Sequence, residues 1–318
     1  MSTVVTGVGL ALTGVVSPQD LLGAVDPDAG PVDPAARIGK KGLRYKDRAT
    51  QLALCCADEA LRDAGILGED GLTVPGETIA VLVASNYGNV DTVCSVVELI
   101  AAEGGTSGIS PMDTPNASSN VIASTLAIKH GLRGPNLMIC NGPTSGVDAV
   151  RWADTLIASG RAGRALVLGV EPDNEAVRKL TGADRVIDGA AAVFLEHSDL
   201  ARERGAETRA VVGLSVRSAG VEDCLASLTG SGPDIAPGAW FPPGDGPQSP
   251  SGELLPQIPR HDFSEVWGEP SAVLGVLQCA AAVGWFAEGG AGPVYALAGR
   301  TGDDATAGLA LLAPGGEW

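Results

Sequence analysis

The sequence predicts a layered α/β fold in which one arrangement of strands and helices occurs twice. Short apolar runs of strand length, such as Ile79–Ala84 and Ala165–Val170, alternate with stretches that have helical apolar spacing. The runs are apolar throughout, which is typical of strands buried on both faces of a sheet. A second strand–helix pattern begins near residue 205, so we expect internal duplication within the 318 residues.

The first elements of the chain are a strand and a capped helix. Thr3–Val8 is rich in β-branched residues and predicts the first strand. After a loop rich in Pro, Asp and Gly, Asp47 precedes a run with helical spacing, so we expect it to cap a helix that ends before Gly65. The strand Ile79–Ala84 and a helix over Asp91–Glu103 follow.

The middle of the chain contains a strand that turns sharply into a helix. Leu137–Cys140 predicts the strand, residues 141–146 form a tight turn, here termed the elbow, and a helix is expected from Thr144 to Ile157. Such a turn lies at the positive end of the helix dipole, where enzymes hold an activated nucleophile. Pro143 occupies the tip and has neither a nucleophile nor a backbone N–H. The pattern therefore predicts an active-site geometry without its reactive atom.

The last third of the chain is less regular. Strands are expected at Ala190–Leu195 and Ala210–Val216. Residues 229–259 are dense in Pro, Gly and Ser, which predicts a long loop or the loss of elements. A helix over residues 271–287 and strands at Val294–Ala298 and Ala307–Leu312 complete the chain.

Composition and charge argue against several classes of function. A formal net charge of −17 would repel nucleic acid, and it argues against this chain as the main docking face for an acidic protein. No apolar run reaches the roughly 18–20 residues of a membrane span, and the start of the chain lacks the basic segment of a signal peptide, so we expect a cytoplasmic location. The six cysteines form no CxxC pair and the three histidines lack metal-ligand spacing. We therefore expect neither a metal site nor a cofactor.

Seven short segments, in order, resemble β-ketoacyl synthases of the decarboxylating, elongating type. They are residues 4–9, 47–53, 110–111, 120, 131–136, 145–146 and 188–191. The resemblance covers roughly residues 1–200 and resumes at about Gly268. It implies the thiolase fold, with duplicated αβαβα halves (1–200 and a shortened 201–318) in a five-layered sandwich that is dimeric across the elbow strand.

The same resemblance implies that the catalytic groups are missing. The family's elbow reads Thr-Ala-Cys-Ala-Ser-Gly, and its cysteine falls on Pro143. The family's Gly-His-Thr pattern falls on residues 268–271, so its histidine position is Glu269, and the His-Gly-Thr-Gly-Thr pattern has no counterpart within residues 229–259. Condensation needs a thiolate and neutral imidazoles that stabilise an enolate, whereas Glu269 would add negative charge there.

The role that we expect is that of a chain-length-factor-like subunit of a type II polyketide synthase. It would form a heterodimer with an active ketosynthase and meet the acyl carrier protein through that partner; polyene-making systems are one such setting. In the family, the helix after the Ser-Pro motif, here about 113–127, crosses the dimer interface and lines the acyl tunnel. We therefore expect small tunnel residues and a deep tunnel, although a close-packed helix or a pure scaffold role would also fit. The expected tunnel residues are Asn116, Ser119, Asn120 and Ala123.

An enzyme with a different nucleophile is the alternative function. Cys140 precedes the elbow tip, and Thr144 and Ser145 follow it, so a thiolase-fold acyltransferase or hydrolase could use one of them. The competing interpretation is a buried strand cysteine and two hydroxyls that cap the elbow helix. Of the histidines, we expect His261 to be the one that could face the pocket.

Overall fold

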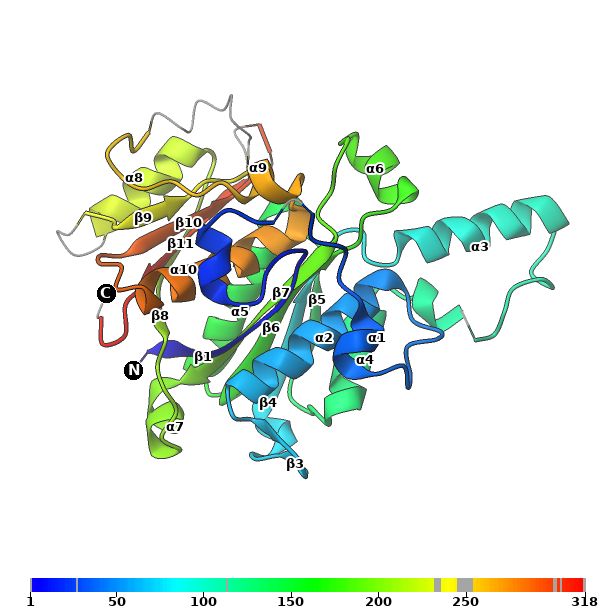
Figure 1. Ribbon diagram of the computed structural model, residues 1–318, viewed down its shortest axis with the longest axis horizontal. Helices are drawn as coiled ribbons and strands as arrows, with labels where there is room; N and C mark the ends of the chain where they lie inside the picture. Colours follow the sequence, from blue (N-terminus) through cyan, green and yellow to red (C-terminus); the bar gives the residue numbers. More distant parts are fainter. Residues whose placement is uncertain are drawn as a thin grey trace.

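The computed structural model describes residues 2–26, 28–112, 114–231, 236–244, 254–299, 302–303 and 305–316. Its centre is one mixed nine-stranded sheet with the order β5-β4-β6-β7-β1-β8-β11-β10-β9 (Figure 1). A separate two-stranded hairpin consists of β2 (Leu67–Gly68) and β3 (Gly71–Leu72). The strands of the large sheet are β1 (Thr3–Ala11), β4 (Ile79–Ala84), β5 (Asn136–Ile139), β6 (Arg164–Glu171), β7 (Gly189–His197), β8 (Ala210–Ser218), β9 (Ala239–Phe241), β10 (Val294–Ala298) and β11 (Thr306–Leu312).

Helices cover both faces of this sheet. The main helices are α2 (Arg48–Asp63), α3 (Val90–Glu103), α4 (Val121–His130), α5 (Ser145–Ala158), α8 (Val221–Ser231) and α10 (Leu274–Ala287). Shorter ones are α1 (Pro34–Ile38), α6 (Glu175–Thr181), α7 (Ser198–Glu203) and α9 (Phe263–Trp267), with 3₁₀ turns η1 (Pro18–Leu22), η2 (Gly76–Thr78), η3 (Thr114–Ala117), η4 (Gly142–Thr144) and η6 (Ser271–Val273). The cap predicted for α2 is present, because the Asp47 carboxylate accepts a 2.7 Å hydrogen bond from the Thr50 amide.

The strand order repeats in mirror image about the contact between β1 and β8. Moving outward, β1, β7, β6 and β4 on one side correspond to β8, β11, β10 and β9 on the other. The helices follow the same rule: α2 follows β1 as α8 follows β8, and α5 precedes β6 as α10 precedes β10. Within the described residues, the counterpart of β5 is reduced to one parallel bridge between Trp240 of β9 and Arg260. The predicted duplication with a shortened second half is therefore confirmed, while the exact boundary at residue 200 stays a prediction.

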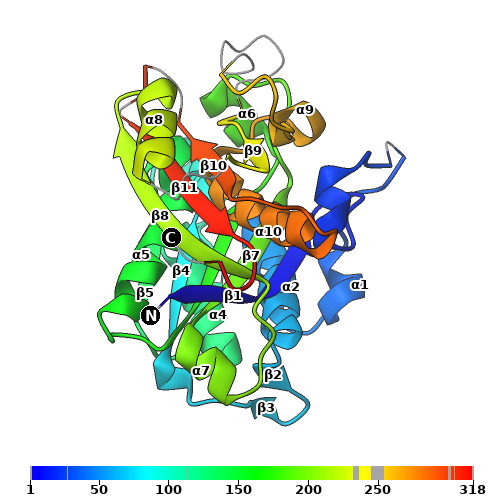
Figure 2. The same cartoon turned by 90° about the vertical axis from the view of Figure 1, so that its left-hand side faces the viewer.

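The alternation of side chains along each strand produces five layers. In β4, Ala80, Leu82 and Ala84 belong to the core shared with α5 and α10, whereas Val81 and Val83 belong to the core under α2 and α4. In β10, Tyr295 and Leu297 pack in the cluster under α8, while their neighbours face the central helices. From one side to the other, the five layers are the outer helices α2 and α4, the strands of the first half, the central helices α5 and α10, the strands of the second half, and α8. Figure 2 shows α8 outside the strands of the second half.

The two central helices cross where each has a glycine. A Cβ added to Gly146 of α5 would lie 2.7 Å from the Ala272 carbonyl oxygen. A Cβ on Gly275 of α10 would lie 2.2 Å from the Val147 nitrogen. Because these neighbours are backbone atoms, the helices approach this closely only without side chains at the crossing. The crossing brings the start of α10 against the elbow.

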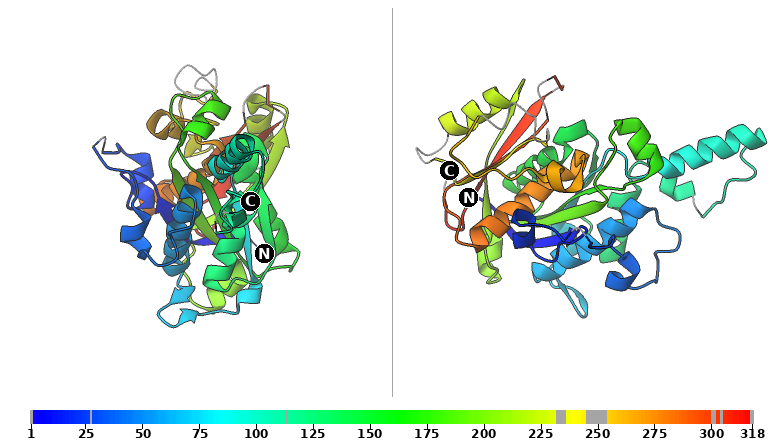
Figure 3. Two further views of the ribbon diagram at one scale, coloured as in Figure 1. Left: turned by 90° about the vertical axis from the view of Figure 1, so that its right-hand side faces the viewer. Right: turned by 45° about the horizontal axis from the view of Figure 1, so that its top comes forward.

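Helix α3 forms an arm that projects from the body of the molecule (Figures 1 and 3). None of its residues is buried. Val93, Val97 and Ile100 are nonetheless exposed on it, and their spacing of four and three residues places them on one helix face. The arm is therefore an apolar helix without a covering partner in the single chain. Of the helices in the described ranges, none is both long and apolar enough to cross a bilayer.

Three predictions about elements were wrong. The helix expected over residues 113–127 is instead the turn η3 followed by α4, with a hydrogen-bonded turn from Ser118 to Val121 between them; residue 113 lies outside the described residues. Helix α8 occupies residues expected to be irregular, although its buried Val221, Cys224, Leu225 and Leu228 carry the helical spacing. Strand β9 lies inside the predicted long loop, of which residues 232–235 and 245–253 are outside the described residues. Three residues are too few to show a strand period.

Candidate functional site

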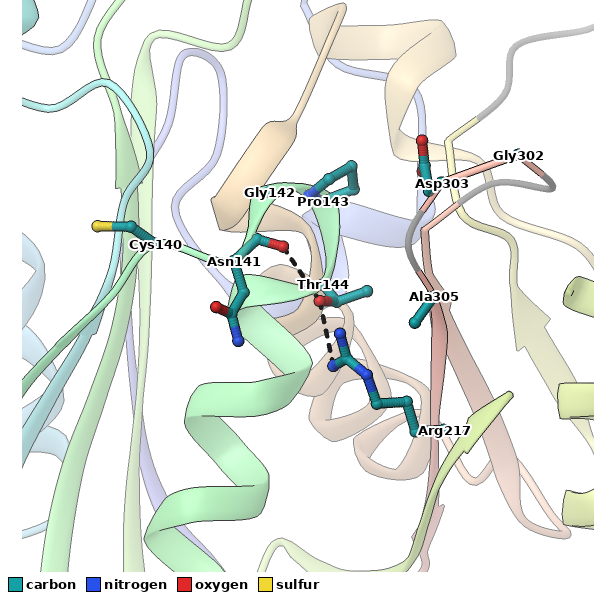
Figure 4. Close-up of a pocket in the computed structure, with 9 residues that line it drawn as sticks. All are labelled: Cys140, Asn141, Gly142, Pro143, Thr144, Arg217, Gly302, Asp303 and Ala305. Carbon is teal, nitrogen blue, oxygen red and sulfur yellow. Dashed lines mark hydrogen bonds between the residues drawn. The ribbon is translucent and has the colours of Figure 1, made fainter. Parts of the chain in front are cut away.

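The elbow lies between β5 and α5 and borders a cleft of about 560 Å³ (Figure 4). Gly142 has a φ of +66°, a conformation that suits glycine, and begins the turn η4. The cleft is lined by the elbow and by residues of two other segments: Cys140, Asn141, Gly142, Pro143, Thr144, Arg217, Gly302, Asp303 and Ala305. Gly302, Asp303 and Ala305, which lie just before β11, thus reach the same cleft.

The turn is fixed by the side chain of Asn86, which follows β4. Its Oδ1 accepts hydrogen bonds from the Gly142 amide and the Ser145 hydroxyl, both at 3.1 Å. Its Nδ2 donates to the Gly142 carbonyl at 2.9 Å. One half-buried side-chain amide therefore satisfies both backbone groups of the residue before Pro143, and the tip of the turn presents a proline ring without a donor.

A charged pair lies beside the elbow. Arg217 of β8 donates through Nη1 to both carboxylate oxygens of Asp148, at 2.9 and 3.0 Å. The Thr144 hydroxyl donates to the same carboxylate at 2.8 Å. Figure 4 shows the guanidinium directed from β8 toward Thr144. These groups satisfy one another, so the wall of the cleft nearest Pro143 is polar rather than shaped for an alkyl chain.

Glu269 is joined to the elbow through two hydrogen-bonded residues, Ser271 and Asn86. Its Oε1 accepts a 3.1 Å hydrogen bond from the Ser271 amide, and the Ser271 hydroxyl accepts one of 2.9 Å from Asn86 Nδ2. Ser271 has a φ of +45°, which is unusual for a residue other than glycine. The structure thus brings Pro143 and Glu269 to one site, linked through Asn86 and Ser271.

Glu171 also belongs to this site, although no role was expected for it from the sequence. It ends β6, is fully buried, and accepts hydrogen bonds from the amides of Asn86 and Tyr87. Burial raises the pKa of its carboxyl to about 7, against the lowering effect of these hydrogen bonds. A glutamate at the end of an otherwise apolar, buried strand was the signal that could have found it.

The three alternative nucleophiles are engaged in structural hydrogen bonds. Cys140 is exposed at the cleft rather than buried in the sheet, its thiol donates to the Ser85 carbonyl at 3.0 Å, and desolvation, followed by the nearby Glu171 carboxylate, raises its pKa. Ser145 is fully buried and its hydroxyl donates to the Gly142 carbonyl at 2.8 Å. The Thr144 hydroxyl is bonded to Asp148 as described. A thiol held in the protonated form is a weak nucleophile.

The histidines do not supply a base at the cleft. His130 is buried at the end of α4, where burial lowers its pKa to about 4. His197 Nδ1 accepts a hydrogen bond from the Asp199 amide at the end of β7. His261, expected to be the best candidate, packs edge-on against the rings of Phe241 and Trp285. In the described residues, no histidine therefore pairs with Cys140, Thr144 or Ser145.

The four expected tunnel residues lie in different environments. Asn116 is buried, and its Nδ2 donates to the Tyr45 carbonyl at 2.7 Å. Ser119 and Asn120 are exposed in the turn before α4. Ala123 is fully buried in the core under α2 and α4. In the single chain the four do not form one wall, and their role in a tunnel stays a prediction.

Comparisons with known proteins agree with the fold. The family described as "Beta-ketoacyl synthase, N-terminal domain" matches residues 5–184, more than half of the chain. The 3-oxoacyl-[acyl-carrier-protein] synthase 2 of Vibrio cholerae is 26% identical over 266 residues, which cover 75% of this chain and 62% of that protein. The tetracenomycin polyketide synthase ketoacyl synthase alpha subunit of Streptomyces glaucescens is 34% identical over 124 residues, 36% of this chain and 28% of that subunit. The chain thus spans less than two thirds of the length of these curated relatives.

Solved structures match over almost the whole chain. The ishigamide ketosynthase/chain length factor superposes with a TM-score of 0.78 at 19% identity and covers 98% of this chain and 99% of the matched chain. AntDE:AntF, a type II polyketide synthase acyl carrier protein in complex with its ketosynthase, gives a TM-score of 0.79 at 16% identity with the same coverage. At these identities the likeness is one of fold. Together with the family match over residues 5–184, it shows that the chain belongs to the β-ketoacyl synthase family and has its thiolase-like fold.

Proposed function

We propose that this chain is a non-condensing, chain-length-factor-like subunit that pairs with an active, cysteine-bearing ketosynthase. The observation that carries the proposal is Pro143 at the tip of an otherwise well-formed elbow, facing the cleft. A proline offers neither a thiolate for the acyl group nor an N–H for an oxyanion. Glu269 nearby adds a carboxylate where condensation would need a neutral hydrogen-bond donor.

Two features of the single chain support a partner. β5 lies at the edge of the nine-stranded sheet and can pair with a strand from another chain. The arm α3 carries Val93, Val97 and Ile100 without covering residues. A ketosynthase that pairs with β5 and covers the arm would remove both from water, which favours a heterodimer across the elbow strand.

The setting that we propose is a type II polyketide synthase, including one that makes polyenes. The structural likeness to the ishigamide ketosynthase/chain length factor and to AntDE:AntF supports this setting. In it, the turn before α4 would contribute Ser119 and Asn120 to the acyl tunnel, and these small side chains would leave the tunnel deep.

The acyl carrier protein is the second proposed partner. The net charge of −17 favours a contact made mainly through the ketosynthase. One basic surface of this chain favours an additional contact: Lys41, Lys46 and Lys129 border a pocket of about 200 Å³. Apolar Leu43 and Ile128 also line it, so an acidic surface with an apolar side chain would fit.

An acyltransferase or hydrolase is the less favoured function. Cys140, Thr144 and Ser145 each lack a histidine partner in the described part of the chain, and the thiol pKa is raised rather than lowered. Incubation with an acyl carrier protein that bears a labelled acyl chain tests this directly. Covalent label on one of the three residues would favour the alternative.

Co-expression with a cysteine-bearing ketosynthase of the same organism tests the subunit role. We expect a stable 1:1 complex by size exclusion with mass determination, and Val97→Glu on the arm should weaken it at least tenfold. Glu98→Gln, on the same helix, is the matched control and should leave the complex intact. A well-behaved homodimer that ignores the ketosynthase would contradict the proposal.

Product length tests the tunnel separately. Ser119→Trp should shorten the product of the complex, because the residue is exposed and can reach a partner without disturbing the core. Ser118→Trp is the control, since that exposed neighbour is not an expected tunnel residue. Equal products from both variants would favour a pure scaffold role.

A further inference from the structure

We propose that Glu171 is a positioning residue that joins the elbow to the root of the arm, and that uptake of a proton by its carboxyl closes this junction while ionisation loosens it. The effect of this junction on partner binding, through the position of the arm, rests on the proposed function. The junction itself does not, because all of its contacts lie within this chain.

The Glu171 carboxyl, here termed the hub, accepts hydrogen bonds from four donor groups. Glu171 Oε1 accepts from the Asn86 amide at 2.7 Å and from the Ser271 hydroxyl at 3.2 Å. Oε2 accepts from the Tyr87 amide at 3.1 Å and from the Ser85 hydroxyl at 3.2 Å. The carboxyl group is fully buried, so each of these donors would lose its partner if the glutamate moved away.

The hub connects three segments that are far apart in the sequence. Residues 85–87 lead from β4 to Asn89, the residue before α3, and so form the root of the arm. The side chain of Asn86 holds the Gly142 backbone of the elbow. Ser271 begins the segment that precedes α10. A displacement of Glu171 would therefore change hydrogen bonds at the root of the arm, at the elbow and at the segment before α10.

Within the described ranges, the charge on this carboxyl is balanced by hydrogen bonds from neutral groups and not by a cation. All four donors are neutral, and burial raises the pKa of Glu171 to about 7. Of the described residues, Tyr87, Cys140 and Glu269 are the ionisable groups that interact with one another or with Glu171 around the hub. Burial raises the pKa of both the Tyr87 phenol and the Cys140 thiol, so these two are uncharged near neutral pH and provide no cation.

The direction of the pH effect follows from linkage. If the junction opens, Glu171 meets water and its pKa returns to about 4.5, so opening releases a proton between pH 4.5 and 7. The closed junction is therefore favoured at lower pH. With these two pKa values, opening should be about tenfold more frequent at pH 8 than at pH 6.

A glutamine at this position is not equivalent to the protonated acid. The neutral acid keeps two oxygens that face the two amides, and either serine hydroxyl can turn to accept its proton. A glutamine must place an NH₂ group against one amide donor, so one hydrogen bond is lost at every pH. Glu171→Gln should therefore loosen the root and also abolish its pH dependence.

Hydrogen exchange tests the proposal on the purified chain, alone or in whatever complex it forms. We would follow peptides that cover residues 82–103 at pH 6 and 8, corrected for intrinsic exchange rates. We expect about tenfold less protection of the root at pH 8 in the unaltered chain, and no such difference in Glu171→Gln. Glu98→Gln, an arm carboxylate, is the matched control and should keep the pH difference.

Equal protection at both pH values in the unaltered chain would overturn the proposal, as would a pH difference that survives in Glu171→Gln. Should that variant not fold, Ser271→Ala removes one hydroxyl and the unaltered chain still provides the pH comparison. Because the readout is exchange within this chain, failure to bind a ketosynthase would overturn the proposed function without affecting this result.

Discussion

Gly275→Ala should destabilise the protein, because the crossing of α5 and α10 has no room for a methyl group. The added Cβ would lie 2.2 Å from the Val147 nitrogen and 2.5 Å from the Gly146 carbonyl carbon. Both neighbours are backbone atoms in a buried helix, so they cannot move aside as a flexible side chain would. Overpacking of this kind costs about 1–3 kcal/mol, and the intrinsic helix preference of alanine returns at most about 1 kcal/mol. We expect a net loss of about 1–2 kcal/mol in the free energy of unfolding, because the clash is with backbone atoms and lies at the upper end of the overpacking range.

Gly230→Ala in α8 is the matched control for this substitution. It is also a helical glycine, but an added Cβ there would have no atom within 4 Å. The control should be neutral or more stable by about 0.5–1 kcal/mol. Urea unfolding followed by far-ultraviolet circular dichroism gives both values. If the two variants agree within about 0.5 kcal/mol, the close crossing does not limit the fold and the reasoning is refuted.

Three further predictions concern the site, the core and the docking surface. Pro143→Cys should restore a thiol that iodoacetamide labels, yet give no condensation on malonyl carrier protein by mass spectrometry, because Glu269 remains. Glu196→Gln should lower the free energy of unfolding by about 3–5 kcal/mol at pH 7, since it leaves the buried Arg164 without its carboxylate; urea titration measures this, and a loss below 1 kcal/mol would contradict it. Lys129→Glu should weaken binding of an acidic carrier protein several-fold in a titration at low salt, whereas equal affinity would locate that contact elsewhere.

Two buried groups should give opposing pH dependence of stability. The pKa of His130 is lowered to about 4 by burial, so its contribution to stability rises by about 3 kcal/mol as pH increases from 4 to 6.5. The pKa of Glu171 is raised to about 7 by burial, so its contribution falls by about 3 kcal/mol between pH 4.5 and 7. The two should nearly cancel in the unaltered protein. When either group is removed, the free energy of unfolding should vary with pH as the remaining group dictates, which urea unfolding at a series of pH values measures. A free energy of unfolding that does not change with pH in either variant would refute the assignment.

Much of the fold could be predicted from the sequence because its strands are apolar on both faces. The strands Ile79–Ala84 and Val294–Ala298 begin and end where expected. The mirrored strand order, by contrast, depends on pairings between distant residues, such as Thr3 with Val212, that no local pattern encodes. The turn before α4 was also missed, although Pro115, Ser118 and Asn120 are residue types that favour turns and helix caps over helix interiors.

Sequence motifs indicated only some residues of the candidate site. The position of Pro143 and Glu269 followed from motif order, and the structure places both beside Asn86 and Ser271. Asn86 and Glu171 carry no motif of their own, and their importance comes from tertiary contacts with three segments. The expected tunnel residues would meet a second chain under the proposed function, and the sequence of one chain does not determine that surrounding surface.

The two ends of the large sheet differ in a way that limits how the protein assembles. At one end β5 has an open edge, while at the other end β9 is already paired with the chain at Arg260. A sheet with open edges at both ends can add neighbours without limit and grow into a fibre. Under the proposed function a second chain would be added at β5, and in the described residues β9 offers a less open edge, so such pairing would favour a closed pair of chains over a fibre.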